Sequence, residues 1–338
     1  MWRIWILNVA IAITFSTAAF GQQQFYDTVS VNGVTRQYLV YLPANFEPEE
    51  NLPVMLHFHG GGGSPEAAIQ FEVDYRPLAD ANRFIAIYPA ALLDNKGCTC
   101  WNNEGPYSNG IDELGFAAAM IDAIASDYNA DEDRIYASGF SLGGSLIWDL
   151  TCYLGDRFAA VAVVAANMWE WTYSDCSSVP PTGMCHILGT NDFYAPYNGN
   201  QYSISVALQN AHWVSINNSE VTPIETPLGG GVTQYLWSEG DNCHTVMHYR
   251  RQGGGHDWPS FARQAIWDFV STYDTNGLID CNTSSCIGDI NNDGLAGVDD
   301  LLIILDAYET SDNGDLDEDG DTDVNDILIL IAAWGPCQ

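Results

Sequence analysis

The sequence is poor in basic residues. Only 10 Lys and Arg stand against 44 Asp and Glu in 338 residues, which gives a formal net charge of −34. No Lys or Arg follows Arg263, whereas acidic residues crowd the C-terminal segment. So few cations cannot neutralise a row of phosphates, which excludes nucleic acids and anionic membrane surfaces as partners. The cluster of acidic residues near the C-terminus instead predicts a bound cation.

Apolar runs long enough to cross a membrane comfortably are also missing. The run from Ile4 to Phe15 is short, follows the single charge of Arg3, and is followed by small residues at Ala19 and Gly21. These features are typical of a secretory signal peptide. We therefore expect residues 1–21 to be removed and the mature protein to be secreted without membrane insertion.

Cysteine pairs at zinc-binding spacing are absent, although the chain has nine cysteines. In an exported protein, cysteines more commonly form disulfides than metal sites. The odd number leaves at least one thiol free or paired between molecules, and the spacing does not determine the connectivity.

The order of apolar segments predicts an α/β domain over residues 22–273. The segment 25–43 alternates around Asn32-Gly33, which is a strong hairpin signal. Buried strands then alternate with helices, a pattern that indicates a mainly parallel sheet covered on both faces. The strands are expected at 53–60, 84–91, 134–139, 158–166, 184–190 and 244–251, and the helices at 64–83, 113–129, directly after Ser141, 204–216 and 261–273.

Ser141 stands where one of these strands turns into a helix, in the pattern Gly139-Phe140-Ser141-Leu142-Gly143. A G-x-S-x-G at such a turn is a nucleophile signature. Upstream, four glycines follow His59 directly after a buried strand. Glycine lets backbone N–H groups face a substrate oxygen, so Gly60 and Gly61, together with the N–H of Leu142, are the expected oxyanion hole.

An acid and a base follow Ser141 in the order that an α/β-hydrolase needs. Asp192 lies just beyond a late strand, and Asp175 is the alternative acid. Among seven histidines, His256 has the loop position after the final strand that suits a base. The predicted chemistry is acyl transfer, in which His256 takes the Ser141 proton and Asp192 orients His256.

These motifs resemble the secreted polyhydroxybutyrate depolymerase and feruloyl esterase family of α/β-hydrolases, which includes family-one carbohydrate esterases. The resemblance rests on "HFHGGGGSPE", "DRIYASGFSLGGSL", "FAAVAVVAA", "LGTNDFYAPYNG" and "GGGHDWPS". It implies a serine carboxylic-ester hydrolase that needs no cofactor for catalysis. Aromatic residues that would line its substrate site are Trp101, Trp169, Trp171 and Trp258.

A duplicated segment occupies residues 287–338, after a linker at 274–286. "GDINNDGLAGVDDLLIILDAY" aligns with "GDLDEDGDTDVNDILILIAAW" at an offset of 26 residues. Each copy places oxygen ligands at the spacing of a calcium loop and an apolar helix after it. The expected ligands of two structural Ca²⁺ ions are Asp289, Asn291, Asp293, the Leu295 carbonyl and Asp300, and then Asp315, Asp317, Asp319, the Asp321 carbonyl and Asp326.

The duplicated segment resembles the dockerin type I modules, which present a helix face to a cohesin partner. Val298-Asp299 and Val324-Asn325 replace the Ser-Thr-like pairs of cellulosomal members. This favours a cell-surface or complex-tethering role, with a cohesin-like protein as the alternative partner. We also expect a disulfide across the ends of the module, formed among Cys281, Cys286 and Cys337.

The dockerin-like segment favours, by analogy, a feruloyl or acetyl ester of plant or algal polysaccharide as the substrate. A polyhydroxyalkanoate polyester is the alternative substrate. A non-catalytic scaffold or adhesion protein and a peptidase are the other classes that the sequence leaves open.

Overall fold

The computed structural model describes residues 23–103, 108, 110–279, 281, 287–291, 295–308, 310–311, 313–317 and 319–336. The expected signal peptide therefore lies outside the described residues. Within the described residues, no helix has both the length and the apolar content that a membrane crossing requires.

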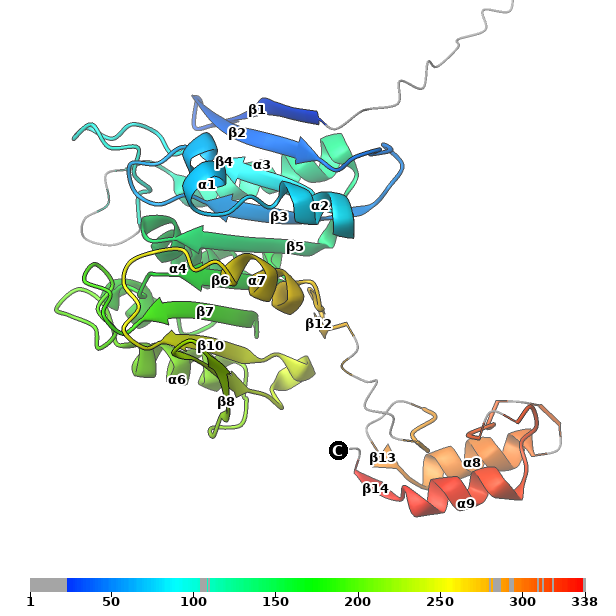
Figure 1. Ribbon diagram of the computed structural model, residues 1–338. Coiled ribbons are helices and arrows are strands. Elements are labelled where there is room, and N and C mark those ends of the chain that lie inside the picture. The colour runs from blue at the N-terminus through cyan, green and yellow to red at the C-terminus, as the bar shows by residue number, and fades with distance from the viewer. Residues whose placement is uncertain are drawn as a thin grey trace, which may run out of the picture.

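A ten-stranded sheet organises the larger part of the chain (Figure 1). The strand order is β1-β2-β4-β3-β5-β6-β7-β10-β9-β8, and the central strands from β4 to β10 run parallel. The strands are β1 (Gln23–Val31), β2 (Val34–Leu42), β3 (Leu52–Phe58), β4 (Ile85–Pro89), β5 (Ala130–Phe140), β6 (Ala160–Val164), β7 (Gly183–Gly189), β8 (Ile224–Gly229), β9 (Val232–Trp237) and β10 (Val246–Arg251).

Helices cover both faces of this sheet, as the alternation of apolar segments predicts. On one face, buried side chains of α3, α4 and α6 pack on the strands, and on the other face those of α1, α2 and α7 do so. The helices are α1 (Pro65–Phe71), α2 (Arg76–Asn82), α3 (Glu113–Tyr128), α4 (Leu142–Leu154), α5 (Glu170–Asp175), α6 (Val206–Ile216) and α7 (Ala262–Val270). Two 3-10 turns, η1 (Gly155–Arg157) and η2 (Asp241–Cys243), complete the connections.

The N-terminal hairpin is confirmed. Asn32 and Gly33 both have positive φ, 51° and 81°, which is the two-residue turn that joins β1 to β2. At the opposite edge, the sequence prediction missed a second hairpin, β8–β9, which is antiparallel to β10. The strands β8 and β9 are exposed or half-buried throughout, so they lack the apolar run that reveals the central strands.

The single helix expected at 64–83 is wrong. The structure has two short helices, α1 and α2, separated by residues 72–75, with Pro77 in the first turn of α2. Proline suits a first turn but cannot continue a helix, because its ring clashes with the preceding turn. The break places Glu72 at the C-terminal end of α1, close to the loop that follows β3.

Three disulfides lie within the described residues: Cys98–Cys100, Cys152–Cys176 and Cys243–Cys281. Cys185 is buried and unpaired. Because Cys281 pairs with Cys243, it does not join the disulfide expected across the C-terminal module; Cys286 and Cys337 lie outside the described residues.

The chain leaves the α/β domain beside the beginning of β5. A small hairpin, β11 (Tyr273–Asp274) with β12 (Gly277–Leu278), follows α7. The Thr275 N–H donates to the Asp133 carbonyl, and the Tyr136 hydroxyl donates to the Tyr273 carbonyl. The first residues of the expected linker are therefore attached to the α/β domain.

The C-terminal repeat forms two helices that lie side by side (Figure 1), α8 (Val298–Ala307) and α9 (Val324–Ala332). A short ladder, β13 (Leu295–Ala296) with β14 (Gly335–Pro336), joins its two ends. Ala296, Ile304 and Leu330 form a small buried core. In both copies the last loop residue, Asp300 or Asp326, accepts hydrogen bonds from the backbone near the start of its own loop.

Candidate active site

Ser141 lies at the apex of a tight turn between β5 and α4. Its backbone has φ 51° and ψ −118°, a conformation that non-glycine residues rarely adopt. After the turn, α4 starts directly against β3. Only glycine fits at position 143, because a Cβ there would lie 2.1 Å from the Phe58 carbonyl oxygen. The glycines of the motif therefore allow the close approach that exposes the serine hydroxyl at the carboxyl end of the parallel strands.

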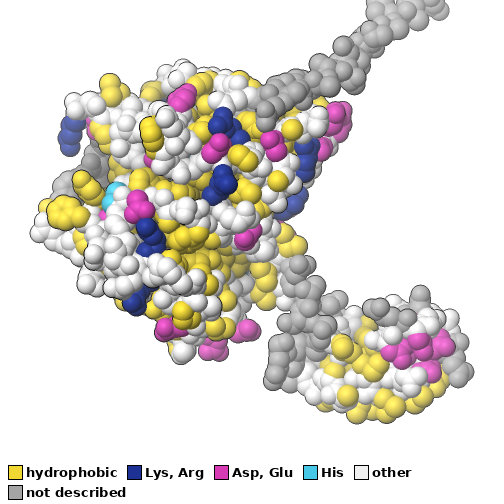
Figure 2. All heavy atoms as spheres, viewed as in Figure 1, with side chains coloured by type: hydrophobic (Ala, Val, Ile, Leu, Met, Phe, Trp, Pro, Cys, Tyr) yellow, Lys and Arg dark blue, Asp and Glu magenta, His cyan; other side chains and the backbone are white. Residues whose placement is uncertain are grey.

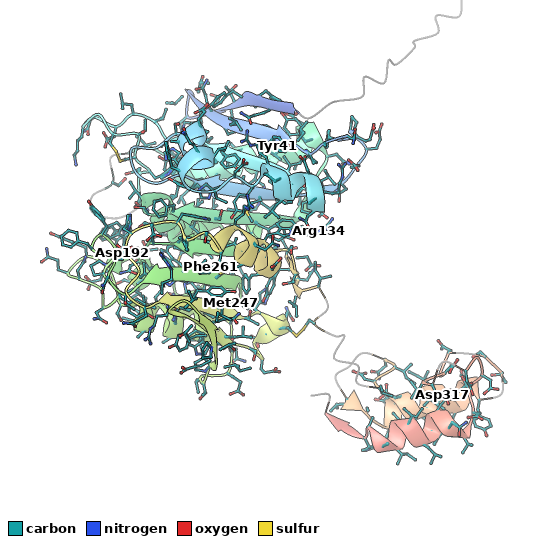
Figure 3. The ribbon with its side chains drawn as sticks, in the orientation of Figure 1. Tyr41, Arg134, Asp192, Met247, Phe261 and Asp317 are labelled. Atoms are coloured by element: carbon teal, nitrogen blue, oxygen red, sulfur yellow. A yellow bond between two sulfur atoms is a disulfide. The ribbon has the colours of Figure 1, made fainter. Side chains whose placement is uncertain are left out.

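Ser141, His256 and Asp192 form one hydrogen-bonded chain. The Ser141 Oγ lies 2.8 Å from His256 Nε2, and His256 Nδ1 lies 2.8 Å and 3.0 Å from the two carboxylate oxygens of Asp192. Asp192 is buried at the loop-bearing end of the sheet (Figure 3). This is the order and geometry of a nucleophile, a general base and the acid that orients the base.

Backbone contacts between two loops bring the acid and the base together. The Asn191 N–H donates to the Gly254 carbonyl, and a Cβ on Gly189 would lie 2.1 Å from the same oxygen. The N–H groups of Tyr194 and Ala195 donate to one oxygen of Asp192 and fix the carboxylate. Asp175, the alternative acid, lies instead near the hydroxyl of Tyr153, at 3.4 Å.

The imidazole of His256 lies between two aromatic rings. The centroid of Phe140 is 5.2 Å from it, and that of Tyr194 is 4.9 Å. Both rings are tilted to the imidazole, whose side chain remains 18% exposed.

The structure changes one of the three expected oxyanion-hole donors. The Gly60 N–H donates to Glu72 Oε1 at 2.9 Å, so it is already bonded and does not face a substrate oxygen. Among the described residues, the N–H groups of Gly61 and Leu142 have no acceptor. Gly61 packs directly on the Leu142 side chain, because a Cβ on Gly61 would lie 3.4 Å from Leu142 Cδ2. Gly61 and Leu142 are therefore the two available donors.

A cavity of about 300 Å³ opens beside Ser141 and His256. A second cavity, of about 410 Å³, adjoins it and shares Trp169 and Tyr202 as lining residues. The two residues are neighbours because Trp169 pairs with Ser203 in a short bridge. The indole rings of Trp169 and Trp171 stack at 5.0 Å with an interplanar angle of 8°.

The four tryptophans expected at the substrate site have different positions. Trp169 lines both cavities, and Trp171 lines the second. Trp101 also borders the second cavity, but it is buried and its indole N–H donates to the His59 carbonyl. Trp258 does not line either cavity; its ring packs edge-on against His57 at a centroid distance of 5.1 Å, and its assignment to the substrate site stays a prediction.

Several polar residues of the first cavity escaped sequence analysis. They come from three segments of the chain: Ser145, Asn167, and Asn200 with Ser203. Asn167 is buried, and its side-chain oxygen has no hydrogen-bond partner within the described residues.

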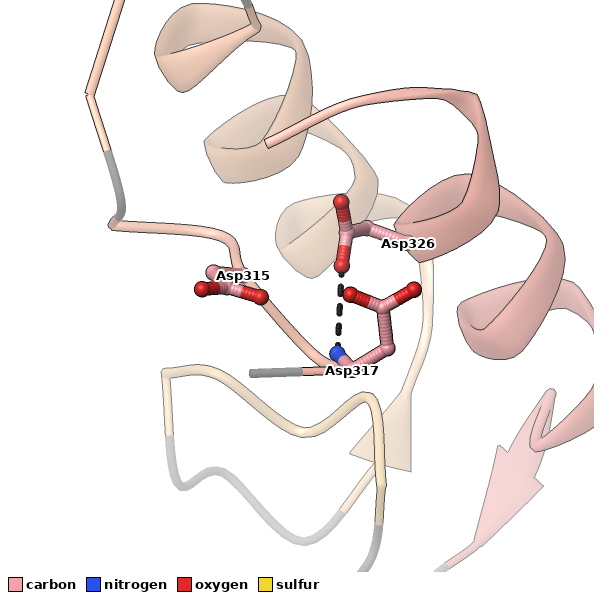
Figure 4. A group of neighbouring side chains, drawn as sticks. All are labelled: Asp315, Asp317 and Asp326. Carbon is pink, nitrogen blue, oxygen red and sulfur yellow. Dashed lines mark hydrogen bonds between the residues drawn. The ribbon is translucent and has the colours of Figure 1, made fainter. Parts of the chain in front are cut away.

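Carboxylates gather in the C-terminal repeat, where Figure 2 shows a cluster of acidic side chains. Asp315, Asp317 and Asp326 converge, and one oxygen atom of each lies within 4.8 Å of the others (Figure 4). Neighbouring carboxylates, first of all Asp319, raise the pKa of Asp321, and burial followed by Asp319 raises that of Asp317. This donor set fits a hard divalent cation.

The first loop is described only in part. Asp289, Asn291, Leu295 and Asp300 are described, whereas Asp293 lies outside the described residues. The calcium-binding role of both loops remains a prediction.

Comparisons with known proteins agree with this chemistry. The family described as "Esterase PHB depolymerase" matches residues 36–181. A bifunctional acetylxylan esterase/xylanase of Neocallimastix patriciarum is 27% identical over 247 residues, which cover 73% of this chain and 35% of that longer protein. A probable feruloyl esterase C of Aspergillus clavatus is 26% identical over 250 residues, which cover 71% of this chain and 84% of the relative.

The α/β domain is a carboxylic-ester hydrolase. Solved structures show the same α/β-hydrolase fold at low identity. An acetyl xylan esterase from Aspergillus awamori matches with a TM-score of 0.55 and 16% identity, covering 73% of this chain and 99% of the other. A feruloyl esterase module from Clostridium thermocellum, complexed with sinapinate, matches with a TM-score of 0.52 and 14% identity, covering 74% and 87%.

Proposed function

We propose that this ester hydrolase is secreted and releases feruloyl or acetyl groups from plant or algal polysaccharide. The hydrogen-bonded chain from Ser141 through His256 to Asp192 carries the proposal, since it provides the nucleophile and base of acyl transfer. The names of the relatives support the substrate class, because both esterases named above act on acyl groups of this kind.

In the proposed mechanism, His256 Nε2 accepts the Ser141 proton as Oγ bonds to the ester carbonyl carbon. The carbonyl oxygen becomes an oxyanion, which the N–H groups of Gly61 and Leu142 stabilise. Collapse of this intermediate breaks the bond to the sugar oxygen, which leaves with the proton from His256. Water then attacks the acyl-enzyme by the reverse sequence, with His256 as base, and releases the acid.

The two adjoining cavities suit an ester of a bulky alcohol. The cavity beside Ser141 would take the acyl group, and the one lined by Trp169, Trp171 and Tyr202 would take the sugar. Aromatic rings stack on the apolar faces of sugars, while polar side chains around them bind hydroxyl groups.

The experiment that tests this function compares wild type with Ser141→Ala on methyl ferulate, p-nitrophenyl acetate and a 3-hydroxybutyrate oligomer, with calcium present. We expect the wild type to prefer one of the first two and the variant to lose activity. Preference for the oligomer would favour the polyester alternative, which the description of the matching family supports.

Reaction with a fluorophosphonate separates an enzyme from a scaffold protein. Labelling of the wild type but not of Ser141→Ala would support the nucleophile, and a wild type that neither reacts nor hydrolyses any of the three esters would contradict the proposal. An amide analogue of the best ester tests the peptidase alternative.

We further propose that the C-terminal repeat is a dockerin-like module that binds two Ca²⁺ ions and tethers the enzyme to a cohesin-like or cell-surface protein. The converging carboxylates of Asp315, Asp317 and Asp326 support the metal site. Large apolar side chains that remain exposed on α8 and α9 support a protein partner; they are Val298, Leu302, Leu305, Val324, Leu328 and Ile331.

A further inference from the structure

We propose that Glu72 is a positioning residue that holds the oxyanion loop, residues 59–63, in its active shape. This inference rests on the proposed acyl-transfer role of Ser141. Glu72 lies at the end of α1, outside both cavities next to Ser141, and therefore does not contact a substrate bound there.

The carboxylate of Glu72 joins the loop to a buried polar group in the sheet. Its Oε1 accepts the Gly60 N–H at 2.9 Å, and its Oε2 lies 2.9 Å from His57 Nε2. His57 is completely buried in β3, and the side chain of Glu72 is only 11% exposed. The loop is thus fixed to a strand of the core through a single side chain.

The hydrogen bonds continue from His57 into the neighbouring strand. His57 Nδ1 lies 3.0 Å from Ser138 Oγ in β5, and the Tyr75 hydroxyl donates to the same oxygen at 3.2 Å. A carboxylate only accepts hydrogen bonds, so His57 donates to Glu72 through Nε2. The Ser138 hydroxyl is also within 3.4 Å of the Leu56 carbonyl oxygen, to which it can donate. Every member of this buried network then has a partner, which gives Glu72 one fixed position.

Gly60 directly precedes Gly61, whose N–H is one of the two available oxyanion donors. Fixing the Gly60 N–H on Glu72 fixes the orientation of the peptide group between His59 and Gly60. The Phe140 ring fills the space beside Gly60, since a Cβ there would lie 3.0 Å from Phe140 Cδ1. Glu72 and Phe140 together restrict the direction in which the next N–H can face.

The far side of the loop has its own supports. The Gly62 N–H donates to the Thr99 carbonyl, and the Thr99 hydroxyl donates to the Gly63 carbonyl. The Gly60 carbonyl, which belongs to the same peptide group as the Gly61 N–H, accepts a hydrogen bond from the Gly63 N–H at 3.0 Å and lies 2.7 Å from His59 Nδ1. Loss of Glu72 would therefore release the peptide group between His59 and Gly60, at the start of the loop, while these other contacts remain.

Three substitutions of Glu72 distinguish the effect of side-chain length from the effect of charge. Gln keeps the length and an acceptor oxygen for the Gly60 N–H, and its amide donates to His57 Nε2 once His57 shifts its proton to Nδ1. Asp keeps the charge but is one methylene shorter, so it cannot contact both partners. Ala removes both contacts.

The test measures kcat and KM with p-nitrophenyl acetate for Glu72→Gln, Glu72→Asp and Glu72→Ala, with melting curves for each. We expect Glu72→Gln to keep kcat within about threefold of wild type, and Glu72→Asp and Glu72→Ala to lose about 10- to 100-fold in kcat at little changed KM. The affinity for a boronic acid, which mimics the tetrahedral intermediate, should fall in parallel with kcat. Glu66→Ala, which removes an exposed carboxylate of the same helix, is the matched control and should leave kcat unchanged.

Equal kcat in Glu72→Asp and wild type would overturn the inference, as would a Glu72→Gln variant as slow as Glu72→Asp. If Glu72→Ala does not fold, the kcat values of Glu72→Gln and Glu72→Asp still test the inference. An active Ser141→Ala variant would contradict the proposed function itself, whereas an inactive Ser141→Ala beside a fully active Glu72→Asp would contradict only the role of Glu72.

Discussion

At the scale of single residues, the proposed role of Asp192 is to orient the base rather than to react itself. Both of its oxygens lie near His256 Nδ1, and two backbone N–H groups hold one of them. Replacing Asp192 with Asn keeps the shape but favours the wrong tautomer of His256. We expect kcat to fall by about 10³- to 10⁴-fold with little change in stability, measured by initial rates and thermal melting. Asp175→Asn is the control, and an equal loss in that variant would contradict the assignment.

Two buried histidines beneath the site make the fold sensitive to acid. Burial lowers the pKa of His186 to about 4, and burial and His186 lower that of His248 well below 6.5. His186 Nε2 lies 3.1 Å from the Ala166 carbonyl oxygen, and His248 Nε2 lies 2.8 Å from the Tyr197 hydroxyl. Because the folded state resists a proton that the unfolded chain accepts, stability is full above pH 6.5 and is lost as the pH falls toward 4.

The expected loss is about 1.4 kcal/mol per pH unit for each such histidine, within that window. Urea unfolding at pH 7, 6 and 5 measures it. His186→Gln removes one titrating group and should flatten the dependence by about that amount, even if it lowers stability at pH 7. An unchanged slope in this variant would show that His186 does not titrate as its burial indicates.

The residues of the triad could be predicted from sequence because each follows a strand whose apolar run is plain. Nothing in the sequence excludes Gly60 as an oxyanion donor. Its acceptor, Glu72, follows α1, and the end of that helix at Phe71 is not evident from the sequence. Trp258 was assigned to the substrate site from its loop position alone. Its contact with His57, a strand residue far away in sequence, depends on packing that no local pattern encodes.

At the scale of elements, the contact between α4 and β3 determines whether the nucleophile turn forms. A methyl group on Gly143 would overlap the Phe58 and His59 carbonyl oxygens, which are backbone atoms and cannot rotate away. We expect Gly143→Ala to lose activity and at least about 3 kcal/mol of stability, measured by chemical unfolding. Gly255→Ala, where a Cβ would meet no atom within 4 Å, should cost less than about 1 kcal/mol.

The sequence predicts the central strands better than the edge hairpin and the short helices, because burial determines how clear an apolar run is. The central strands are buried on both faces, so their apolar runs stand out. The hairpin β8–β9 has no such run, and the break between α1 and α2 leaves only Pro77 as a sign. That break is the one that places Glu72 beside the oxyanion loop.

At the scale of the whole molecule, the C-terminal repeat and the α/β domain should respond differently to calcium. Without a cation the carboxylates of the repeat repel one another, so its folding should depend on the metal. We expect calorimetry to show a transition that shifts upward with Ca²⁺, while hydrolysis of p-nitrophenyl acetate stays unchanged in EDTA. Asp315→Asn combined with Asp326→Asn removes ligands of the second loop only and should reduce the shift, and loss of esterase activity in EDTA would contradict the independence of the two parts.

The exit of the chain beside the start of β5 has a consequence for how the enzyme meets its substrate. Thr275 is hydrogen-bonded to Asp133 in β5, whereas Ser141 directly follows the end of that strand, about 26 Å away at 3.3 Å per residue. An enzyme anchored through its C-terminal segment would thus be held by the pole opposite its catalytic opening. Such attachment would leave the catalytic opening clear of the tether.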